Sequence, residues 1–379
     1  MSGSTVLWIA GVGWDQVTGT DKRIVLELSR IRPVVWIDPP VPLRRPGPIG
    51  ASAPECVAPG VSRVRVTVLP GVTRWGLRTL TARIVESAAA GILAGLDDPT
   101  VVVAFPIARF PRSDRAVRVL YATDDWLDGA GLMGFSPDLV RRTIASNVDR
   151  AHGLAAVTPT LLALTSALGS QRDAPEARPV GAVIANGAPA PVASRAHRLP
   201  IAGLIGQINE RIDLTLLEAV VDRGVPLRIV GPRTDRDAAF GRRLDALLGA
   251  PGVEWTGGVP HAELPAHLGE IGVGLTPYVD SRFNRSSFPL KTLEYLSAGL
   301  CVVSSDLPAS RWLDSPHVVV RGQADAFADA VVAQLALAPD ADREDECREL
   351  AAAHSWSRRA EELTALIELA RARRSAPVG

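Results

Sequence analysis

The hydrophobic and polar positions along this chain indicate strands and helices in alternation. Short runs of aliphatic and β-branched residues are each followed by a turn and then by positions with helical periodicity. Such units form parallel sheets covered by helices, so the pattern predicts two α/β sheets of similar size. The runs lie at residues 6–10, 34–38, 64–69, 101–105, 117–122, 154–158 and 182–185 in the first half, and at residues 201–205, 227–230, 253–256, 273–276, 301–304 and 318–320 in the second.

Three segments outside these runs suggest how the chain is divided. Residues 186–200 contain an Asn-Gly dipeptide and three prolines, which is typical of a connector, so we expect a first domain over 1–190 and a second over 191–355. The proline-rich stretch 39–59 predicts an irregular loop. The remainder, 356–379, predicts an amphipathic helix over 357–374 with an apolar face made of Ala360, Leu363, Leu366, Ile367 and Ala370.

The composition excludes several partners and anchors. The 379 residues carry 41 basic and 41 acidic side chains, whereas a nucleic-acid-binding or polybasic membrane-binding domain would show a basic excess. The N-terminus does not follow a signal-peptide pattern, and the longest uncharged stretch, 151–171, contains a proline and fits a strand followed by a helix. We therefore expect a soluble cytoplasmic protein that binds no nucleic acid.

Cysteine and lysine are both rare in this chain. The three cysteines, Cys56, Cys301 and Cys347, are too few and too far apart in the sequence to indicate a disulfide framework or a zinc cluster, and they fit a reducing compartment. Of the 41 basic residues only Lys22 and Lys291 are lysines. In a chain so strongly biased toward arginine, a retained lysine suggests a need for a compact point charge.

One segment predicts a helix together with both of its ends. In SSFPLKTLEYLSAG, residues 286–299, Ser287 can cap the start, Pro289 fits the first turn, and Gly299 ends the helix. Lys291 and Glu294, three residues apart, then share one face. The opposite, apolar face consists of Leu290, Leu293 and Leu296.

The lysine in this first turn suggests an anionic ligand. A cation there opposes the helix dipole by up to about 1 kcal/mol, which a bound diphosphate would offset. Glu294, one turn further, is placed to accept hydrogen bonds from ribose hydroxyls. A solvated Lys291–Glu294 pair on a surface helix explains the same residues equally well and stays open.

The same helix lies within a series of motifs that resembles the GT-B glycosyltransferases, in particular the family 4-like group. Residues 289–303, PLKTLEYLSAGLCVV, resemble the family's PLK-x-x-EYL-A-G-x-PVV segment. Four further segments follow the family's order and spacing: residues 183–187, residues 204–206 with 211–214, residues 253–260 and residues 273–278. The resemblance is strong from residue 183 to residue 306 and loose in the first half.

The resemblance implies a fold and a set of donor-binding residues. It implies two Rossmann-like domains facing across a cleft, with the nucleotide sugar on the second, the acceptor on the first, and the C-terminal helix packing back on the first. Glu294 would be the ribose-binding member of the family's pair of glutamates, and Ser286 stands in place of the other, which leaves the sugar and the stereochemical outcome open. The implied donor site comprises Gly206, Arg211, Ser287, Pro289, Leu290, Lys291 and Glu294, with Arg211 and Lys291 on the diphosphate.

A candidate acceptor site lies in the loop after the first predicted strand. Gly13, Trp14 and Asp15 combine an approachable backbone, an apolar ring and a hydroxyl acceptor, which suits a sugar, although an ordinary glycine turn explains them too. Lys22 opens the next helix and can reach the same region. Asp38 lies at the end of the second predicted strand, where a dehydrogenase has its ribose-binding acid. The loop after the first strand lacks the third glycine of the dinucleotide-binding motif, so an NAD-dependent oxidoreductase is a minor alternative.

Two carboxylates follow the strand at 117–122, at the end where open α/β sheets bind ligands. Glycosyl transfer with inversion needs a group that takes the acceptor proton, and Asp125, with Asp124 as the second choice, is the candidate base. A hydrogen-bonded capping loop is the equally weighted alternative. Asp235 and Asp237 spell a metal-binding D-x-D in a polar loop, but no histidine or cysteine lies at ligand spacing, and we expect no metal and no other cofactor.

These observations predict a glycosyltransferase that moves a sugar from a nucleoside diphosphate to a hydroxyl on a glycan, a lipid carrier or a natural product. A nucleotide-sugar epimerase of the same fold and a non-catalytic two-lobed binding protein are the alternatives. The basic amphipathic stretch 74–84 suggests peripheral contact with the inner membrane if the acceptor is lipid-linked, although an ordinary domain helix is favoured. The sequence indicates no oligomeric state.

Overall fold

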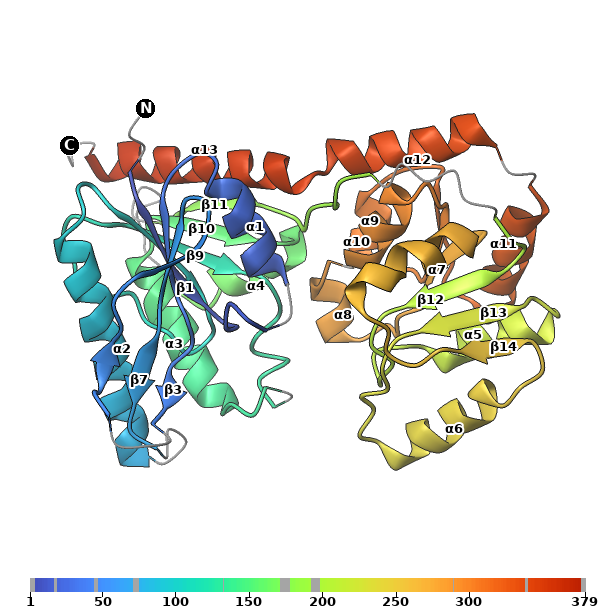
Figure 1. The fold of residues 1–379 in the computed structure, drawn as a ribbon, viewed down its shortest axis with the longest axis horizontal. Helices are drawn as coiled ribbons and strands as arrows, with labels where there is room; N and C mark the ends of the chain where they lie inside the picture. Colours follow the sequence, from blue (N-terminus) through green and yellow to red (C-terminus); the bar gives the residue numbers. More distant parts are fainter. Residues whose placement is uncertain are drawn as a thin grey trace. The chain divides into compact units, whose positions relative to one another are not determined.

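The computed structural model describes residues 4–16, 19–43, 47–70, 75–131, 133–170, 178–191, 198–288, 290–337 and 340–375. The chain forms two compact units, the first made of Met1–Ala185 with Trp356–Gly379 and the second of Asn186–Ser355 (Figure 1). The sequence placed the boundary a few residues later, after residue 190. Among the described residues, no helix is both long and apolar enough to cross a bilayer.

The first unit is built on an eight-stranded sheet in the order β11-β10-β9-β8-β1-β2-β6-β5, parallel except for the β5–β6 pair. A small three-stranded sheet, β3-β7-β4, adjoins α2. The strands are β1 (Val6–Ala10), β2 (Val34–Ile37), β3 (Val41–Pro42), β4 (Gly50–Ala51), β5 (Glu55–Ala58), β6 (Val61–Val64), β7 (Val66–Val68), β8 (Thr100–Ala104), β9 (Val117–Ala122), β10 (Gly153–Ala156) and β11 (Val180–Val183). The helices are α1 (Thr20–Leu28), α2 (Trp75–Ala94), α3 (Pro137–Arg150), α4 (Pro159–Ser166) and α13 (Trp356–Ser375).

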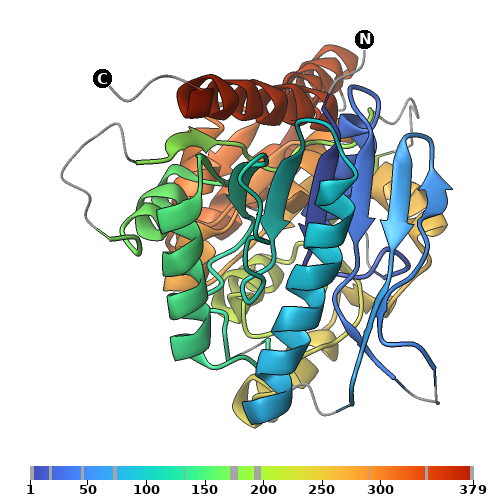
Figure 2. The same ribbon diagram turned by 90° about the vertical axis from the view of Figure 1, so that its left-hand side faces the viewer.

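The last helix, α13, belongs to the first unit, although the second unit separates it from that unit in the sequence. It packs on α1 and on β9, β10 and β11, and Figure 2 shows it lying across one end of the sheet. Near its end, Arg371 donates to Ser4 and Thr100 at the amino ends of β1 and β8. All five residues of the predicted apolar face are buried. The expectation that the C-terminal helix returns to the first domain is confirmed.

The prediction of an irregular loop over residues 39–59 was wrong. Three short strands, β3, β4 and β5, lie within it. They are exposed or half-buried edge strands held by backbone pairing, so they carry no hydrophobic alternation for a pattern to detect. The predicted run at 64–69 belongs to two strands, because exposed Arg65 separates β6, which pairs with β2, from β7 in the small sheet.

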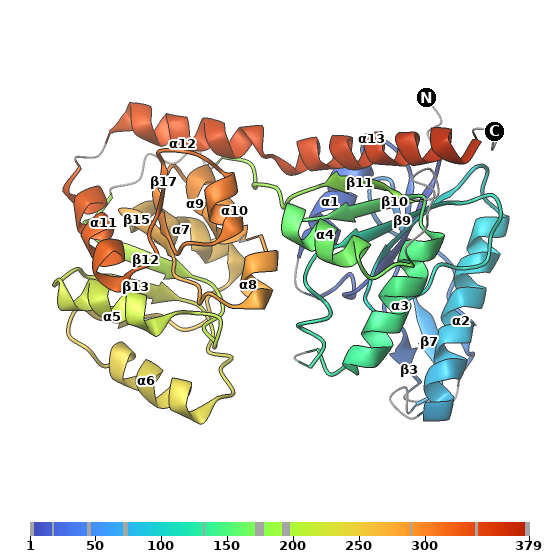
Figure 3. The same cartoon turned by 180° about the vertical axis from the view of Figure 1, so that it is seen from behind.

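The second unit is built on a six-stranded parallel sheet in the order β14-β13-β12-β15-β16-β17 (Figure 3). Aliphatic side chains of its central strands, with those of α5 and α11, form the core of this unit. The strands are β12 (Ala202–Ile205), β13 (Leu227–Val230), β14 (Val253–Trp255), β15 (Val273–Thr276), β16 (Val302–Ser304) and β17 (Val318–Val320). The helices are α5 (Leu214–Asp222), α6 (Ala238–Leu248), α7 (Leu264–Glu270), α8 (Arg282–Ser286), α9 (Leu290–Ser297), α10 (Pro308–Trp312), α11 (Ala324–Ala336) and α12 (Ala341–Ala353).

Each sheet has one point at which the strand order reverses. In the first unit this point lies between β1 and β8, and in the second between β12 and β15. Ligands of open α/β sheets bind in the crevice outside the carboxyl ends of the two strands at such a point. The two crevices are therefore where functional side chains should gather.

Candidate functional site

In the second unit, Tyr295 of α9 holds the crevice between β12 and β15 in shape. The ladder between these strands ends at the Gly203–Gly274 pair. Beyond it, the Tyr295 hydroxyl accepts a hydrogen bond from the Ile205 N–H at 2.7 Å and donates one to the Gly203 carbonyl at 3.2 Å. The ring lies against Gly274, where any side chain would overlap it. Tyr295 thus takes the place of a neighbouring strand and ties α9 to the end of β12.

The loop after β12 is shaped by two glycines. Gly206 and Gly231 both have φ of +149°, a conformation that other residues rarely adopt. A Cβ on Gly231 would overlap the Gly206 carbonyl group, so the two loops touch backbone to backbone. On its other side, a Cβ on Gly206 would lie 3.5 Å from the Cε atom of Lys291. The structure therefore brings together two of the predicted donor-binding residues, Gly206 and Lys291.

Lys291 and Glu294 form an ion pair on the first turns of α9, with 2.5 Å between Nζ and Oε2. Their side chains are 27% and 17% exposed, so the pair is more enclosed than a freely solvated surface pair. An ammonium has three donors, and Glu294 takes one of them, so the others remain available to an anion at the start of the helix. The end of α9 is as predicted: Gly299 has φ of +78°, its N–H bonds to Leu296, and Leu300 bonds back to Tyr295.

Arg211 lies in the turn before α5 and is positioned by the segment that follows β15. Its backbone carbonyl accepts from the Val279 N–H, and its Nε donates to Oδ1 of buried Asn284 at 2.9 Å. The guanidinium stacks on Phe283, 4.8 Å from the ring centroid, and on Tyr278 at 5.5 Å. Among the described residues its terminal nitrogens have no hydrogen-bond partner, which leaves donors for a phosphate.

The remaining predicted donor residues lie around the junction of α8 and α9. Ser287 is buried and donates to the Phe283 carbonyl, so it closes α8, and Leu290 begins α9. Pro289 lies outside the described residues. Ser286, at the position of the family's other glutamate, is also buried, and its hydroxyl donates to the Arg282 carbonyl.

In the first unit, the predicted acceptor loop rests on a buried carboxylate. Asp38 accepts from the Trp14 N–H, from the Trp36 indole and, at 2.6 Å, from Nε of Arg63. Arg63 also donates to Asp15 at 2.7 Å, and this hydrogen bond holds the pKa of Asp15 below its ordinary value. Asp38 and Arg63 are 3% and 6% exposed, so Asp38 supports the loop and is not presented to a ribose.

Lys22 holds the same loop from α1. Its ammonium donates to the Trp14 carbonyl at 2.9 Å and lies 4.7 Å from the centroid of the Trp14 ring. The Trp14 ring is 7% exposed and packs edge-on against Trp36. Gly13 is fixed by hydrogen bonds with Gln16 in both directions. Of the three predicted acceptor residues, Asp15 is the one whose side chain reaches solvent, with 73% of its surface exposed.

A carboxyl that sequence reasoning missed lies at the crevice of this unit. Asp21, in the first turn of α1, is 7% exposed and accepts from the Gly11 N–H, and Gly11 itself lies against the Ala104 carbonyl at the end of β8. Burial raises the pKa of Asp21 to about 7, with a smaller contribution from the charge of Asp124. A carboxyl that titrates near neutral pH in a crevice is a candidate acid or base.

The structure places the two predicted base candidates differently. Asp124 is exposed, whereas Asp125 is buried and accepts from the Asp128 N–H at 3.1 Å. That bond is the turn-capping role that the sequence had left open for Asp125. Asp21, Asp124 and Asp125 are therefore three carboxyls at the carboxyl ends of β1 and β9.

Both carboxylates of the D-x-D motif at residues 235–237 accept hydrogen bonds from their own loop and the helix that follows it. Asp235 accepts two hydrogen bonds from Arg233, at 3.0 and 3.1 Å. Asp237 caps α6 by accepting from the N–H groups of Ala239 and Phe240. Both carboxylates serve the local structure of their loop.

Comparison with known proteins identifies the second unit. Residues 201–336 match the family model of "Glycosyl transferases group 1". The second unit is a group 1 glycosyltransferase domain. TuaH of Bacillus subtilis strain 168, named as a teichuronic acid biosynthesis glycosyltransferase, is 35% identical over 121 residues, which cover 31% of this chain and 30% of TuaH. The resemblance seen in the sequence is confirmed.

Solved structures extend the likeness to the fold of the whole chain. An apo structure of OtsA has a TM-score of 0.68 at 11% identity, with 97% of this chain and 99% of that one covered. HepE of Anabaena, in complex with UDP and glucose, has a TM-score of 0.62 at 12% identity, with 97% and 100% covered. The predicted GT-B architecture around this glycosyltransferase domain is therefore confirmed.

Proposed function

We propose that the chain transfers a sugar from a nucleoside diphosphate to a hydroxyl of a glycan, a lipid carrier or a natural product. The observation that carries the proposal is the cluster of Gly206, Lys291 and Glu294 at the crevice of the second sheet, inside the segment that matches the family model. An approachable backbone, a helix start and a compact cation are the features that bind a diphosphate. The structure of HepE with UDP and glucose makes a UDP-sugar the first donor to test.

In the proposed reaction, the oxygen of the acceptor hydroxyl forms a bond to the anomeric carbon as the bond from that carbon to the diphosphate breaks. Lys291 and Arg211 stabilise the charge that develops on the leaving nucleoside diphosphate. The hydroxyl proton passes to a carboxylate that acts as the general base, for which Asp125, Asp124 and Asp21 are the candidates. We expect no metal in this step, because Lys291 and Arg211 would supply the positive charge that the diphosphate needs.

Nucleotide binding tests the donor site. UDP, GDP and dTDP are titrated against the full chain by calorimetry and by thermal shift. We expect one of them to raise the melting temperature, and Lys291→Ala or Arg211→Ala to weaken its binding by tenfold or more, as loss of a charge-assisted hydrogen bond predicts. Arg223→Ala is the control, because Arg223 follows α5 at the other end of the sheet and pairs with Asp325 and Asp329. Equal affinities in all variants would show that these residues do not bind the nucleotide.

Turnover distinguishes the proposed reaction from the alternatives. Each nucleotide sugar is incubated with the chain without acceptor, and release of nucleoside diphosphate and the identity of the sugar are both measured. Slow hydrolysis with the sugar unchanged supports a transferase. An altered sugar still attached to the nucleotide would indicate an epimerase, and binding with no turnover under any acceptor would indicate a binding protein.

A further inference from the structure

Three residues far apart in the sequence converge in the second unit, at the amino ends of two adjacent strands. Cys301 directly precedes β16, His317 directly precedes β17, and Cys347 lies on α12. The ligand atoms of all three lie within 4.8 Å of one another. Both cysteines are buried, and Cys301 and His317 are held side by side because the Val302 N–H bonds to the His317 carbonyl. The sequence expectation that these cysteines are too far apart to share a site does not hold for this pair.

We propose that Cys301, His317 and Cys347 bind a divalent cation of the zinc type. Two thiolates and an imidazole are the ligands that Zn²⁺ prefers. The distances fit such an ion: the two Sγ atoms are 3.8 Å apart, and Sγ of Cys301 is 3.8 Å from Nδ1 of His317. In a tetrahedral site with Zn–S of about 2.3 Å and Zn–N of about 2.0 Å, these edges would be about 3.8 Å and about 3.5 Å. These two edges need to change by only a few tenths of an ångström. The third edge, between Cys347 and His317, is bounded at 4.8 Å and would shorten by up to about 1.3 Å as the ion binds.

The surroundings of His317 also suit a metal ligand. Nδ1 faces Cys301, while Nε2 lies 3.1 Å from Oε2 of Glu346. A metal-bound histidine commonly donates its other N–H to a carboxylate, which fixes the tautomer and turns the free nitrogen toward the ion. Glu346 sits on α12 next to Cys347, so one turn of this helix supplies both a ligand and the carboxylate that orients another.

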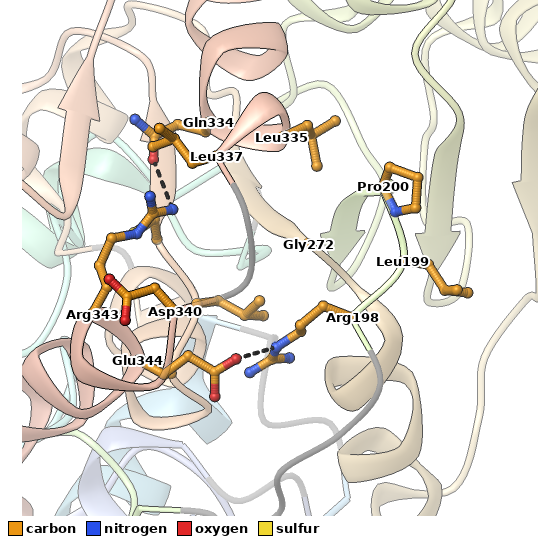
Figure 4. Close-up of a pocket in the computed structure, with 13 residues that line it drawn as sticks. Arg198, Leu199, Pro200, Gly272, Gln334, Leu335, Leu337, Asp340, Arg343 and Glu344 are labelled. Carbon is orange, nitrogen blue, oxygen red and sulfur yellow. Dashed lines mark hydrogen bonds and ion pairs between the residues drawn. The ribbon is translucent and has the colours of Figure 1, made fainter.

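A pocket lies beside Cys301, the one of the three ligands that lines it. Cys301 lines a pocket of about 140 Å³ together with Arg198, Arg343 and Glu344. Arg343 and Glu344 of α12 and Arg198 lie around this pocket, with Arg198 paired to Glu344 (Figure 4). In the proposed site, a water molecule from this pocket would be the fourth ligand, as in sites with three protein ligands.

The position of the site indicates its role. It lies where α9 ends and β16 begins, whereas Lys291 lies at the other end of α9, so the ion does not take part in the proposed transfer. It would fasten α12 to the strands β16 and β17. Metal binding to the native chain then adds directly to its stability.

Cobalt binding tests the proposal on the full chain. The chain is stripped of metal under reducing conditions and titrated with Co²⁺, which gives thiolate charge-transfer and intense visible bands in a tetrahedral thiolate site. We expect one Co²⁺ per chain, displaced by Zn²⁺, with a rise in melting temperature on adding either ion. Cys347→Ser should abolish the bands, and Cys56→Ser, at an exposed cysteine of the first unit, should leave them unchanged.

A milder variant covers the case in which Cys347→Ser does not fold. Glu346 is 62% exposed, so Glu346→Gln should fold normally while weakening metal binding by tenfold to 100-fold. Absence of the bands in the reduced wild-type chain would overturn the proposal. So would bands that persist in Cys347→Ser, or an affinity that does not change in Glu346→Gln. None of these outcomes bears on nucleotide binding, which is measured separately.

Discussion

The contribution of Tyr295 to the crevice between β12 and β15 can be measured by removing a single oxygen atom. Tyr295→Phe keeps the ring against Gly274 but leaves the Ile205 N–H without its acceptor and the Gly203 carbonyl without its donor. Gly203 belongs to the last pair of the ladder between β12 and β15, and Ile205 lies beyond it. Tyr295 is fully buried, so water does not replace the hydroxyl in the folded chain.

The expected cost follows from these two bonds. A buried N–H left unsatisfied costs about 1–3 kcal/mol, and the carbonyl loses a bond worth about 1 kcal/mol, so the free energy of unfolding should fall by about 2–4 kcal/mol. Glu294 precedes Tyr295 in the chain, and Gly206 follows Ile205. Loss of the two hydrogen bonds should therefore also make the positions of Glu294 and Gly206 less fixed and weaken the proposed binding of a nucleoside diphosphate. The two effects should appear together in this variant.

Urea unfolding with a matched control measures the effect. Tyr278→Phe also removes one phenolic oxygen from the second unit, but that hydroxyl makes no hydrogen bond among the described residues, and its loss should cost less than about 0.5 kcal/mol. Hydrogen exchange at the Ile205 amide reports on the bond directly and should accelerate in Tyr295→Phe alone. Equal unfolding midpoints for the two variants, or unchanged exchange at Ile205, would refute the structural role given to Tyr295.

Three further predictions concern the crevices of the two units. Because burial raises the pKa of Asp21 from 3.8 to about 7, the folded chain binds more protons there than the unfolded chain, so stability should fall by up to about 4 kcal/mol as pH rises from about 4 to about 7. Asp21→Asn should flatten that dependence in urea titrations across this range, and an unchanged slope would show that Asp21 titrates normally. Asp38→Asn should cost about 3–5 kcal/mol, since it leaves buried Arg63 without its buried partner, and a loss below about 1 kcal/mol in urea would contradict this. Gly231→Ala should abolish folding or nucleotide binding, whereas Gly224→Ala, with φ of +73° and open space around it, should cost only about 1 kcal/mol; similar melting temperatures would contradict the backbone contact.

Local signals explain why much of the second unit could be predicted. The start and end of α9 depend on residues within the helix and its flanks, and Gly299 adopts the left-handed conformation that its position after the helix predicts. The two central strands, β12 and β15, are buried along their whole length and stand out as apolar runs in the sequence. Lys291 and Glu294 are also predictable from local sequence, because a spacing of three residues places two side chains on the same face of a helix.

The residues that sequence reasoning missed depend on pairing between distant strands. Arg63 reaches Asp38 and Asp15 only because β6 pairs with β2 beside the loop that follows β1. Asp21 looks like an ordinary acidic residue of a first helical turn until burial at the crevice changes its pKa. No spacing in the sequence joins Cys301 to Cys347, because their contact arises where α12 packs on α9.

The two lysines make comparable contacts at the crevices of the two sheets. Lys22 donates to the Trp14 carbonyl while its ammonium, a compact point charge, lies over the indole of the same residue. Lys291 runs beside Gly206, where its Cε would lie 3.5 Å from an added Cβ, before it reaches Glu294. A larger guanidinium at that point would occupy the space beside Gly206 where we propose that a diphosphate binds. In a chain that otherwise uses arginine throughout, each lysine lies where its side chain must run close to a loop that follows the first strand of its sheet.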